Sequence, residues 1–204
     1  MNTKSIRMVS LTKGYFTHRE EIDAAYHRVM ESGWYILGEE VRRFEADFAN
    51  WCGAKACIGV GNGTDAIALC LRSLAVGPGD AVFTVSHTAV ATVAAIEMTG
   101  ASAVLVDIEP EYFTMDANSL ERAVQNVKGS SRPRAVIAVH IYGQACDLTA
   151  IRAVCDARGL YLIEDCAQAF GATYKGRAVG SIGHVGGCSF NVYKTITSGD
   201  GGNR

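Results

Sequence analysis

The sequence of 204 residues lacks the features of several protein classes. Its most apolar window, residues 89–98, is too short to span a bilayer. The N-terminal residues contain no continuous apolar core followed by a cleavage site, so we expect no signal peptide. The net charge of −2 provides no basic field for nucleic acid or for an anionic membrane. We therefore expect neither of these partners.

Motifs for metal binding and for serine hydrolysis are also missing. The seven cysteines include no C-x-x-C pair, and the histidines show neither H-x-x-x-H nor H-x-H spacing, so we predict no metal. No G-x-S-x-G elbow occurs, which argues against a serine hydrolase. Most cysteines fall in apolar segments, as small buried thiols do, and this favours the reducing cytoplasm.

What the sequence does contain is a regular alternation of strand and helix signals. Apolar residues make up 49% and charged residues 20%, as in ordinary globular proteins. Two helical stripes come first, one over residues 22–30 and one over residues 41–51. The predicted strands are 56–60, 81–85, 103–107, 135–141 and 161–165, and the predicted helices between them include 90–98, 119–127 and 148–158. This order predicts an α/β fold with a mostly parallel sheet, helices on both faces, and strands buried on both sides. Residues 128–134 read as a surface loop.

Ligands of such sheets bind beyond the carboxyl ends of the strands, and three segments with polar chemistry fall there. The first runs from Gly61 to Asp65, G-N-G-T-D. Its glycines let the backbone approach a ligand, Thr64 could cap the next helix, and free N–H groups at a helix start bind phosphate. The alternative is a plain turn with a threonine cap. Because the motif is neither G-x-G-x-x-G nor a P-loop, we expect no dinucleotide or ATP.

The second segment follows the strand Y-L-I-E-D, which ends at Asp165. This carboxylate is either a functional acid or a helix cap, and Glu164 points to the other face of the sheet. Gln168, three residues further on, could hydrogen-bond a ligand or the backbone.

The third segment contains Lys194, between the aromatic Phe190 and a glycine-rich tail. Its amine could do chemistry, or it could be an ordinary solvated lysine. Ser189 could bind a phosphate or a neighbouring carbonyl group. Taken together, a phosphate cup, a strand-end acid and a lysine are the set that pyridoxal phosphate requires. The phosphate takes helix-start amides, the pyridine nitrogen takes a carboxylate, and the aldehyde takes an amine.

The sequence resembles the DegT/DnrJ/EryC1/StrS family of sugar aminotransferases, which have the type I fold of aspartate aminotransferase. The matching segments follow one another along nearly the whole chain: G-N-G-T-D-A from Gly61, G-P-G-D from Gly77, S-H-T-A-V-A-T from Ser86, V-D-I from Val106, V-H-I-Y-G-Q from Val139, I-E-D-C-A-Q-A-F-G-A from Ile163, S-I-G from Ser181 and S-F-N-V-Y-K from Ser189.

The resemblance implies roles for individual residues. Lys194 matches the Schiff-base lysine and Asp165 the partner of the pyridine nitrogen, so these two are the expected catalytic residues. Gln168 matches the residue that bonds the phenolic oxygen of the ring. The expected cofactor-binding set is Gly63, Thr64, Asp65, Ala89, Asp165, Gln168, Ser189 and Lys194, with Thr64, Asp65 and Ser189 on the phosphate.

Two positions depart from the family pattern. Ala89 stands where members often carry an aromatic residue stacked on the pyridine ring, so His87 or another side chain would have to cover that face. Phe170 stands where many members carry histidine. Related dehydratases have histidine at the lysine position, so Lys194 favours transamination.

Family members are longer than this chain by well over a hundred residues. We therefore expect residues 1–204 to be the N-terminal part of the large domain, with a helical segment at 1–52, an α/β core at 53–204, and no small C-terminal domain. The expected activity is transfer of an amino group from glutamate or glutamine to a keto sugar, which the resemblance implies to be nucleotide-linked, by a homodimer. The alternatives are a cyclitol aminotransferase of the inosose type and a truncated, non-catalytic fragment.

Overall fold

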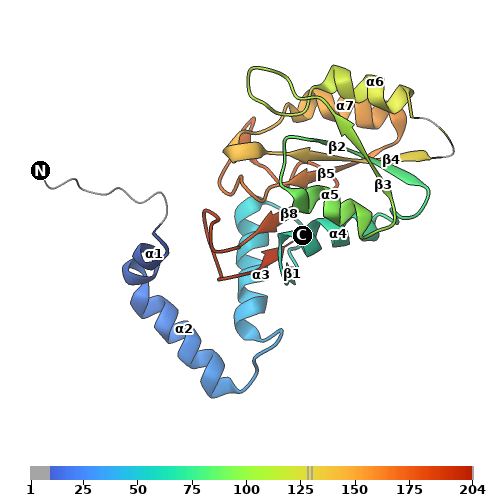
Figure 1. Cartoon of the computed structure of the whole chain (residues 1–204). Coiled ribbons are helices and arrows are strands. Elements are labelled where there is room, and N and C mark those ends of the chain that lie inside the picture. Colours follow the sequence, from blue (N-terminus) through green and yellow to red (C-terminus); the bar gives the residue numbers. More distant parts are fainter. Residues whose placement is uncertain (1–9, 128, 130, 204) are drawn as a thin grey trace, which may run out of the picture.

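The computed structural model describes residues 10–127, 129 and 131–203 (Figure 1). The helices are α1 (Leu11–Thr17), α2 (Arg19–Ser32), α3 (Glu39–Cys52), α4 (Gly63–Ser73), α5 (Val90–Glu97), α6 (Ala117–Gln125) and α7 (Leu148–Arg158), with a short 3₁₀ turn η1 (Ile141–Gly143). The strands are β1 (Gly59–Val60), β2 (Asp80–Val85), β3 (Ser102–Val106), β4 (Arg132–Val139), β5 (Tyr161–Asp165), β6 (Thr173–Tyr174), β7 (Arg177–Ala178), β8 (Val185–Ser189) and β9 (Gly202–Asn203).

Seven of these strands form one sheet, in the order β1-β9-β8-β5-β4-β2-β3. The strands β3, β2, β4, β5 and β8 are parallel to their neighbours, whereas β9 runs antiparallel to both β8 and β1. The predicted mostly parallel sheet is confirmed. In register, Val139 of β4 lies beside Asp165 of β5, and Asp165 lies beside Gly187 of β8. The carboxyl ends of three strands therefore meet at one edge of the sheet.

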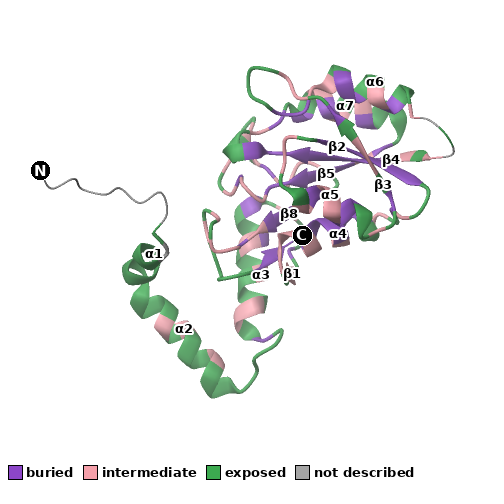
Figure 2. Ribbon diagram, viewed as in Figure 1, coloured by how far each residue is buried: buried purple, intermediate pink, exposed green. Residues whose placement is uncertain are grey.

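Helices cover both faces of the sheet, as predicted: α6 and α7 lie on one side, and α4 and α5 lie on the other (Figure 1). The strands β2, β4 and β5 between these layers are almost entirely buried (Figure 2). The edge strand β3 is different, because Leu105 is 57% exposed, Ser102 is also exposed, and of its five residues only Val106 is buried. The prediction of burial on both faces is therefore wrong for this strand, which has a sheet neighbour on one side only.

Most predicted boundaries agree with the structure to within a few residues, and α7 agrees at both ends. The main exception is β4, which begins at Arg132, inside the predicted loop 128–134. Arg132 extends the strand because its guanidinium lies 2.7 Å from the buried carboxylate of Asp80 and its N–H donates to Gly79 O at 2.9 Å. Residues 128 and 130 of that loop lie outside the described residues.

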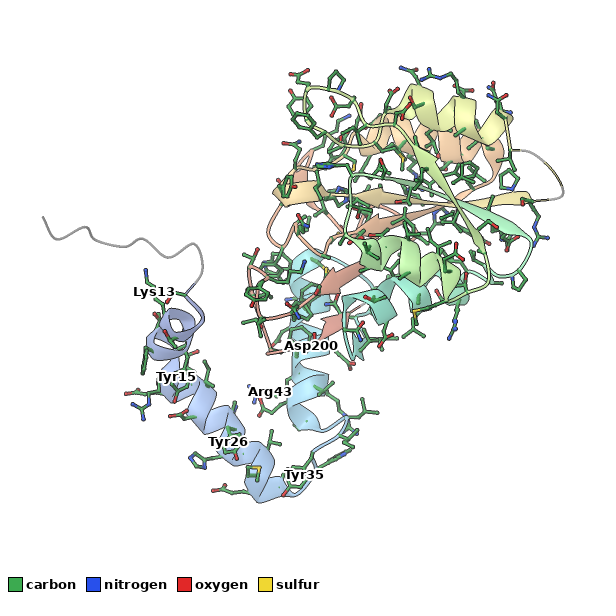
Figure 3. All side chains as sticks on the ribbon, in the orientation of Figure 1. Lys13, Tyr15, Tyr26, Tyr35, Arg43 and Asp200 are labelled. Atoms are coloured by element: carbon green, nitrogen blue, oxygen red, sulfur yellow. The ribbon has the colours of Figure 1, made fainter. Side chains whose placement is uncertain are left out.

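The two N-terminal helical stripes behave differently in the structure. Helix α2 has no buried residue, and it extends away from the body together with α1, as the labelled Tyr15 and Tyr26 show (Figure 3). Helix α3 packs instead against the sheet domain, where the rings of Phe44 and Phe48 lie edge-on to Phe190, at 5.2 and 5.7 Å between centroids. The 1–52 segment thus contains one helix that is anchored to the α/β core and one that is not.

All seven cysteines are buried and none forms a disulfide, which agrees with their prediction as apolar thiols. Phe170, where the family pattern often has histidine, stacks on Trp51 at 4.4 Å and serves to pack α3. Among the described residues, no helix combines the length and the apolar character needed to cross a membrane.

Candidate active site

The first element of the site is the N-terminus of α4. The cap is Asn62, whose Oδ1 accepts from the N–H of Asp65 at 2.8 Å and whose Nδ2 donates to Asp65 Oδ2 at 2.9 Å. The expectation that Thr64 caps this helix is wrong, because Thr64 already lies inside the first turn. Asp65 is engaged on both its N–H and its carboxylate, so a role on a phosphate remains a prediction for this residue.

Gly63 brings α4 against the end of β8. A Cβ atom at this position would lie 2.7 Å from Cβ of Ser189 and 3.1 Å from its Oγ, so only glycine allows the contact. In the part of the chain that the structure describes, the N–H groups of Gly63 and Thr64 have no hydrogen-bond acceptor. Two unpaired donors at a helix start and a hydroxyl group next to them form a cup suited to an anion.

The second element is Asp165, which is 6% exposed at the end of β5. Its Oδ2 accepts from the hydroxyl of Thr92 at 2.9 Å, and its Oδ1 accepts from the N–H of Ala167 at 3.1 Å. Burial raises the pKa of Asp165; the two hydrogen bonds and the charge of Lys194 act in the opposite direction without overcoming it. A buried acid of this kind is stabilised as an anion when a cationic partner binds next to it.

Thr92 is a residue that the sequence analysis did not single out. It lies on α5, is 1% exposed, and is also hydrogen-bonded to Thr88 at 2.8 Å between the two hydroxyl oxygens. The only signal for it in the sequence was its place within the segment S-H-T-A-V-A-T, where no role was assigned to it. Two threonines four residues apart do not by themselves indicate a functional site. Only the fold brings the hydroxyl of Thr92 to the carboxylate of Asp165.

The third element is the turn that carries Lys194. Its N–H donates to Asn191 O at 2.9 Å, and its side chain is half-buried. The charge of Lys194 acts to lower the pKa of Asp165, so the two groups are near enough to interact electrostatically. Ser189, at the end of β8, connects this turn to the cup at α4.

Gln168 and Ala89 complete the predicted set. The side-chain Oε1 of Gln168 accepts from the N–H of Tyr142 at 3.0 Å. Ala89 precedes α5 as its exposed N-cap residue and offers no ring. The ring of His87, two residues earlier, lies 5.8 Å from that of Tyr142 in an edge-on arrangement and 6.3 Å from that of Phe113. The rings of Phe113 and Tyr142 thus lie around His87, two residues before Ala89.

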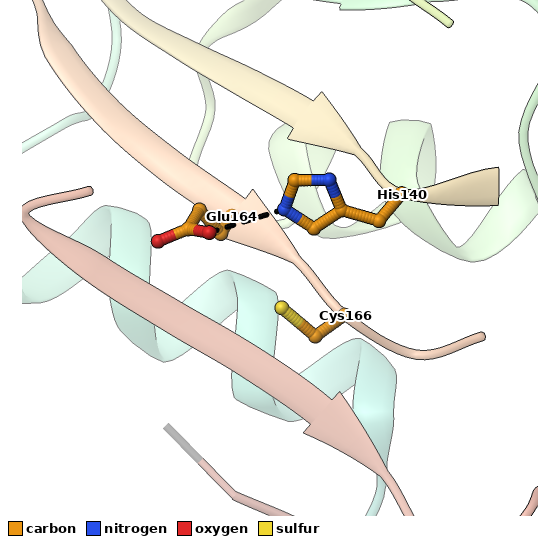
Figure 4. Close-up of side chains that lie close together, drawn as sticks. All are labelled: His140, Glu164 and Cys166. Carbon is orange, nitrogen blue, oxygen red and sulfur yellow. Dashed lines mark hydrogen bonds and ion pairs between the residues drawn. The ribbon is translucent and has the colours of Figure 1, made fainter. Parts of the chain in front are cut away.

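On the other face of β5 lies a buried cluster of His140, Glu164 and Cys166 (Figure 4). Their potential ligand atoms are within 4.8 Å of one another. Glu164 Oε2 accepts from His140 Nε2 at 3.1 Å and from Gly180 N–H at 2.8 Å. Its Oε1 accepts from the N–H groups of Ile182 and Gly183 at 2.7 and 2.6 Å. Four donors already occupy the carboxylate, so its geometry is that of a hydrogen-bonded hub and not of an open metal site.

The tautomer of His140 follows from its neighbours. The N–H of Cys146 donates to His140 Nδ1 at 3.1 Å, so Nδ1 carries a lone pair and the proton is on Nε2, directed at Glu164. Burial acts to raise the pKa of Glu164, but the bonds from His140 and from the backbone N–H groups outweigh it and hold this pKa below its usual range. The cluster therefore keeps a buried carboxylate ionised and bonded.

The assembled site combines an anion cup, an amine and a buried acid along one edge of the sheet. The structure brings Gly63 against Ser189 at the cup, with Thr64 next in the chain, and Lys194 is near enough to Asp165 for its charge to act on the pKa of that acid. Such a set can hold an anionic group at one end of a flat ligand, pair a cationic ring atom with the acid, and present an amine to an electrophilic carbon.

Several known proteins that this chain resembles are transaminases of nucleotide-linked amino sugars. The chain is 46% identical over 173 residues to the dTDP-3-amino-3,6-dideoxy-alpha-D-galactopyranose transaminase of Aneurinibacillus thermoaerophilus, covering 85% of this chain and 46% of that protein. It is 41% identical over 201 residues to the dTDP-3-amino-3,4,6-trideoxy-alpha-D-glucose transaminase of Streptomyces venezuelae, covering 98% and 52%.

The fold comparison agrees. The crystal structure of DesV from S. venezuelae, in complex with a ketimine intermediate, matches with a TM-score of 0.93 and 40% identity over 98% of this chain and 53% of that one. The chain thus spans about half the length of these relatives. The model of the DegT/DnrJ/EryC1/StrS aminotransferase family matches residues 17–203. With the predicted motifs, the predicted parallel sheet and these matches in agreement, the chain belongs to the DegT/DnrJ/EryC1/StrS aminotransferase family.

Proposed function

We propose that this chain is the cofactor-binding part of a pyridoxal-phosphate-dependent aminotransferase that acts on a nucleotide-linked keto sugar. The observations that carry the proposal are the buried carboxylate of Asp165, within electrostatic reach of Lys194, and the N–H groups of Gly63 and Thr64, which have no acceptor among the described residues. The relatives named above are transaminases of dTDP-linked amino sugars, which supports the substrate class. Those names give no support to the cyclitol alternative, which is not favoured.

The donor set fits pyridoxal phosphate. The N–H groups of Gly63 and Thr64 and the hydroxyl of Ser189 would hold the phosphate, and Asp165 would pair with the protonated ring nitrogen. The cradle is narrow, since a Cβ atom at position 63 would fill it. Asp65 and Ala89 would lie at the margins of the bound group, Asp65 as the residue that Asn62 holds at the helix start. When bound, this cofactor supplies an electron-withdrawing ring that stabilises negative charge on the carbon bearing the transferred nitrogen.

The chain's own residues would contribute binding and proton transfer. Lys194 would hold the cofactor's aldehyde through its Nζ atom and, after release, would move a proton at the substrate carbon as general base and then as general acid. Asp165, held by Thr92 and Ala167, would keep the ring nitrogen protonated. Glutamate or glutamine would be the amino donor.

A covalent trapping experiment tests the lysine. The 204-residue chain is incubated with pyridoxal phosphate, reduced with borohydride and digested, and the modified peptide is identified by mass spectrometry. We expect one pyridoxyl group, on Lys194, that disappears in Lys194→Ala and persists in Lys175→Ala, since Lys175 is bonded to Thr149 on the surface. An adduct that survives Lys194→Ala would show that this assignment is wrong.

The substrate class needs a separate measurement. With the cofactor supplied in its amino form, the chain is offered dTDP- and UDP-linked keto sugars and an inosose, and loss of that form is followed by absorbance. Preference for the inosose would favour the cyclitol alternative. Reaction with none of them would favour the non-catalytic alternative.

We also propose that the functional unit is a homodimer in a reducing cytoplasm. The exposed apolar residues on and after the α2 helix support the first part: Ile22, Tyr26, Met30, Trp34, Ile36 and Leu37 are each between 44% and 79% exposed. The seven cysteines, all buried and none in a disulfide, support the reducing cytoplasm. Sedimentation of the chain at increasing concentration measures the association.

A further inference from the structure

The turn that follows β4 has an unusual backbone. Tyr142 has φ 53° and ψ 21°, and Gly143 follows with φ 86°. The left-handed region is costly for a residue with a side chain, and a tyrosine there calls for an explanation. The side chain does not provide one, since Tyr142 is 77% exposed and its ring lies edge-on to that of His87, at 5.8 Å between centroids.

What the turn achieves is the placement of one N–H group. Within this turn the N–H of Tyr142 donates to Oε1 of Gln168, 3.0 Å away, while the left-handed angles at Tyr142 and Gly143 turn the following chain back. The turn is fixed on both sides of that group, because His140 N–H donates to Asp165 O at 3.1 Å and Gln144 N–H donates to Ile141 O at 2.9 Å. The loop 140–144 is therefore tied to the segment that carries Asp165 and Gln168.

This bond decides which end of the Gln168 amide is available to a ligand. The oxygen is used as an acceptor, so the two donor hydrogens on Nε2 form the free end. Among the described residues, no acceptor is bonded to Nε2. An amide held in this way can donate to an oxyanion, but it cannot turn to present its oxygen without losing the bond to Tyr142.

We propose that the turn at Tyr142 and Gly143 is a positioning device, which locks Gln168 so that its NH₂ group donates to an anionic oxygen on a ligand bound beside Asp165. This inference rests on the proposed function for the identity of the ligand, which would be the phenolate oxygen of pyridoxal phosphate. Tyr142 acts through Gln168 and does not itself touch the reacting atoms.

Two measurements test the device, one without any ligand. Hydrogen exchange of the Tyr142 amide is followed by NMR in the free protein, and the dissociation constant of pyridoxal phosphate is measured by equilibrium dialysis. In Gln168→Leu the Tyr142 amide loses its acceptor, and we expect about tenfold faster exchange and about tenfold weaker binding. Gln168→Glu keeps an acceptor for Tyr142 but has no NH₂ group, so exchange stays slow while binding weakens.

The turn is tested at Gly143, outside the ligand-contacting set. A Cβ atom there would meet nothing closer than Gln168 O at 3.7 Å, but φ of 86° is strained for alanine, so Gly143→Ala displaces the turn without a clash. In Gly143→Ala we expect the same faster exchange of the Tyr142 amide and the same weaker binding of pyridoxal phosphate as in Gln168→Leu. Gly143→Asn should partly restore both, because asparagine tolerates the left-handed region. The matched control is Gly159→Ala, which imposes the same kind of strain at φ 64° at the end of α7, with no neighbour within 4 Å.

The outcomes separate this inference from the proposed function. If Gly143→Ala leaves both the exchange of Tyr142 and the affinity for pyridoxal phosphate at the wild-type values, the positioning role is wrong. The same holds if Gly159→Ala weakens binding equally, or if Gly143→Ala still weakens binding in the Gln168→Leu background. If the wild-type chain shows the predicted exchange pattern but does not bind pyridoxal phosphate, the ligand assignment fails and the coupling of Tyr142 to Gln168 stands.

Discussion

Glu164 and Asp165 are neighbours at the end of β5 that face opposite sides of the sheet and are both buried. Glu164 accepts from four donors, and its pKa lies below the usual range. Asp165 accepts from two donors, and burial raises its pKa. The carboxylate of Glu164 therefore has its full set of hydrogen-bond donors on one face of the sheet, whereas the carboxyl group of Asp165 on the other face does not.

The difference separates a structural acid from an acid available for chemistry. A saturated carboxylate has no vacant lone pair for a ligand, and here it holds the loop 180–183 and His140 in place. An under-satisfied buried carboxylate gains most when a cation arrives, which is the situation of an acid opposite a protonated ring nitrogen. The four predictions that follow test this contrast in order of decreasing effect.

The largest effect is expected for Glu164→Gln. Wherever the amide nitrogen is placed it faces two N–H donors, those of Ile182 and Gly183 or those of Gly180 and His140. Breaking such a buried network by removing one charge costs about 3–5 kcal/mol of unfolding free energy. Urea denaturation measures the loss. A cost near zero would show that the hub does not need its charge.

Asp165→Asn should increase the unfolding free energy, where Glu164→Gln decreases it. The asparagine Oδ1 can accept from Ala167 and its Nδ2 can donate to Thr92, so every polar atom stays paired and the buried charge is gone. We expect the free protein to gain about 0.5–2 kcal/mol, as when a functional residue is replaced, and to lose affinity for pyridoxal phosphate. Urea denaturation measures the stability and equilibrium dialysis measures the affinity on the same sample. Destabilisation of the free protein would contradict the contrast between Glu164 and Asp165.

The two acids should also give opposite pH dependences. Since the pKa of Asp165 is raised by folding, its contribution to stability is largest below its unfolded pKa and falls as the pH rises through the folded value. Since the pKa of Glu164 is lowered, its contribution is present above its unfolded pKa and is lost as the pH falls through the folded value. Each proton changes the slope by at most about 1.4 kcal/mol per pH unit. Thermal unfolding of wild type and Asp165→Asn is measured from about pH 3 to about pH 8. The fall in stability with rising pH that Asp165 causes should appear in the wild type only.

The smallest effect is expected at Thr92, which supplies one of the two bonds to Asp165. Thr92→Val keeps the shape and removes the hydroxyl, at a cost of about 1 kcal/mol, and raises the pKa of Asp165 further. Thr92→Ser is the matched control because it retains the donor. Carboxyl chemical shifts followed by NMR titration report the pKa. Equal titration of the Val and Ser variants would remove Thr92 from the site.

Much of the fold could be predicted because its signals are local. Apolar runs of β2, β4 and β5 and the boundaries of α7 follow from period and capping, as with Asp147, whose side chain accepts from Thr149 and Ala150 at the start of α7. The family resemblance then singled out Asp165, Gln168 and Lys194 as predicted site residues, and the charge of Lys194 acts on the pKa of Asp165. Helix α2 shows the limit of this reasoning, because its apolar stripe predicts a helix but not what that stripe packs against.

The misses concern interactions between distant segments. The cap at Asn62 competes with Thr64 for the same role, and only the backbone angles decide which residue is the cap. The extension of β4 to Arg132 depends on Asp80, fifty-two positions away in the chain. Thr92, Tyr142 and His140 lie within segments that match the family pattern, but nothing in those segments shows which distant groups they contact.

By itself, the sequence determined the order of the helices and strands in the central part of the fold, the family, and which side chains we predict to carry the chemistry, because period, capping and motif lie in neighbouring residues. Only the tertiary structure decided how each buried charge is treated. The number of donors around Glu164 and Asp165 depends on the loop 180–183, on α5 and on His140 at the end of β4, which reach β5 from separate parts of the chain. Hydrogen bonds act over about 3 Å, so their energies are fixed only when folding brings those segments together.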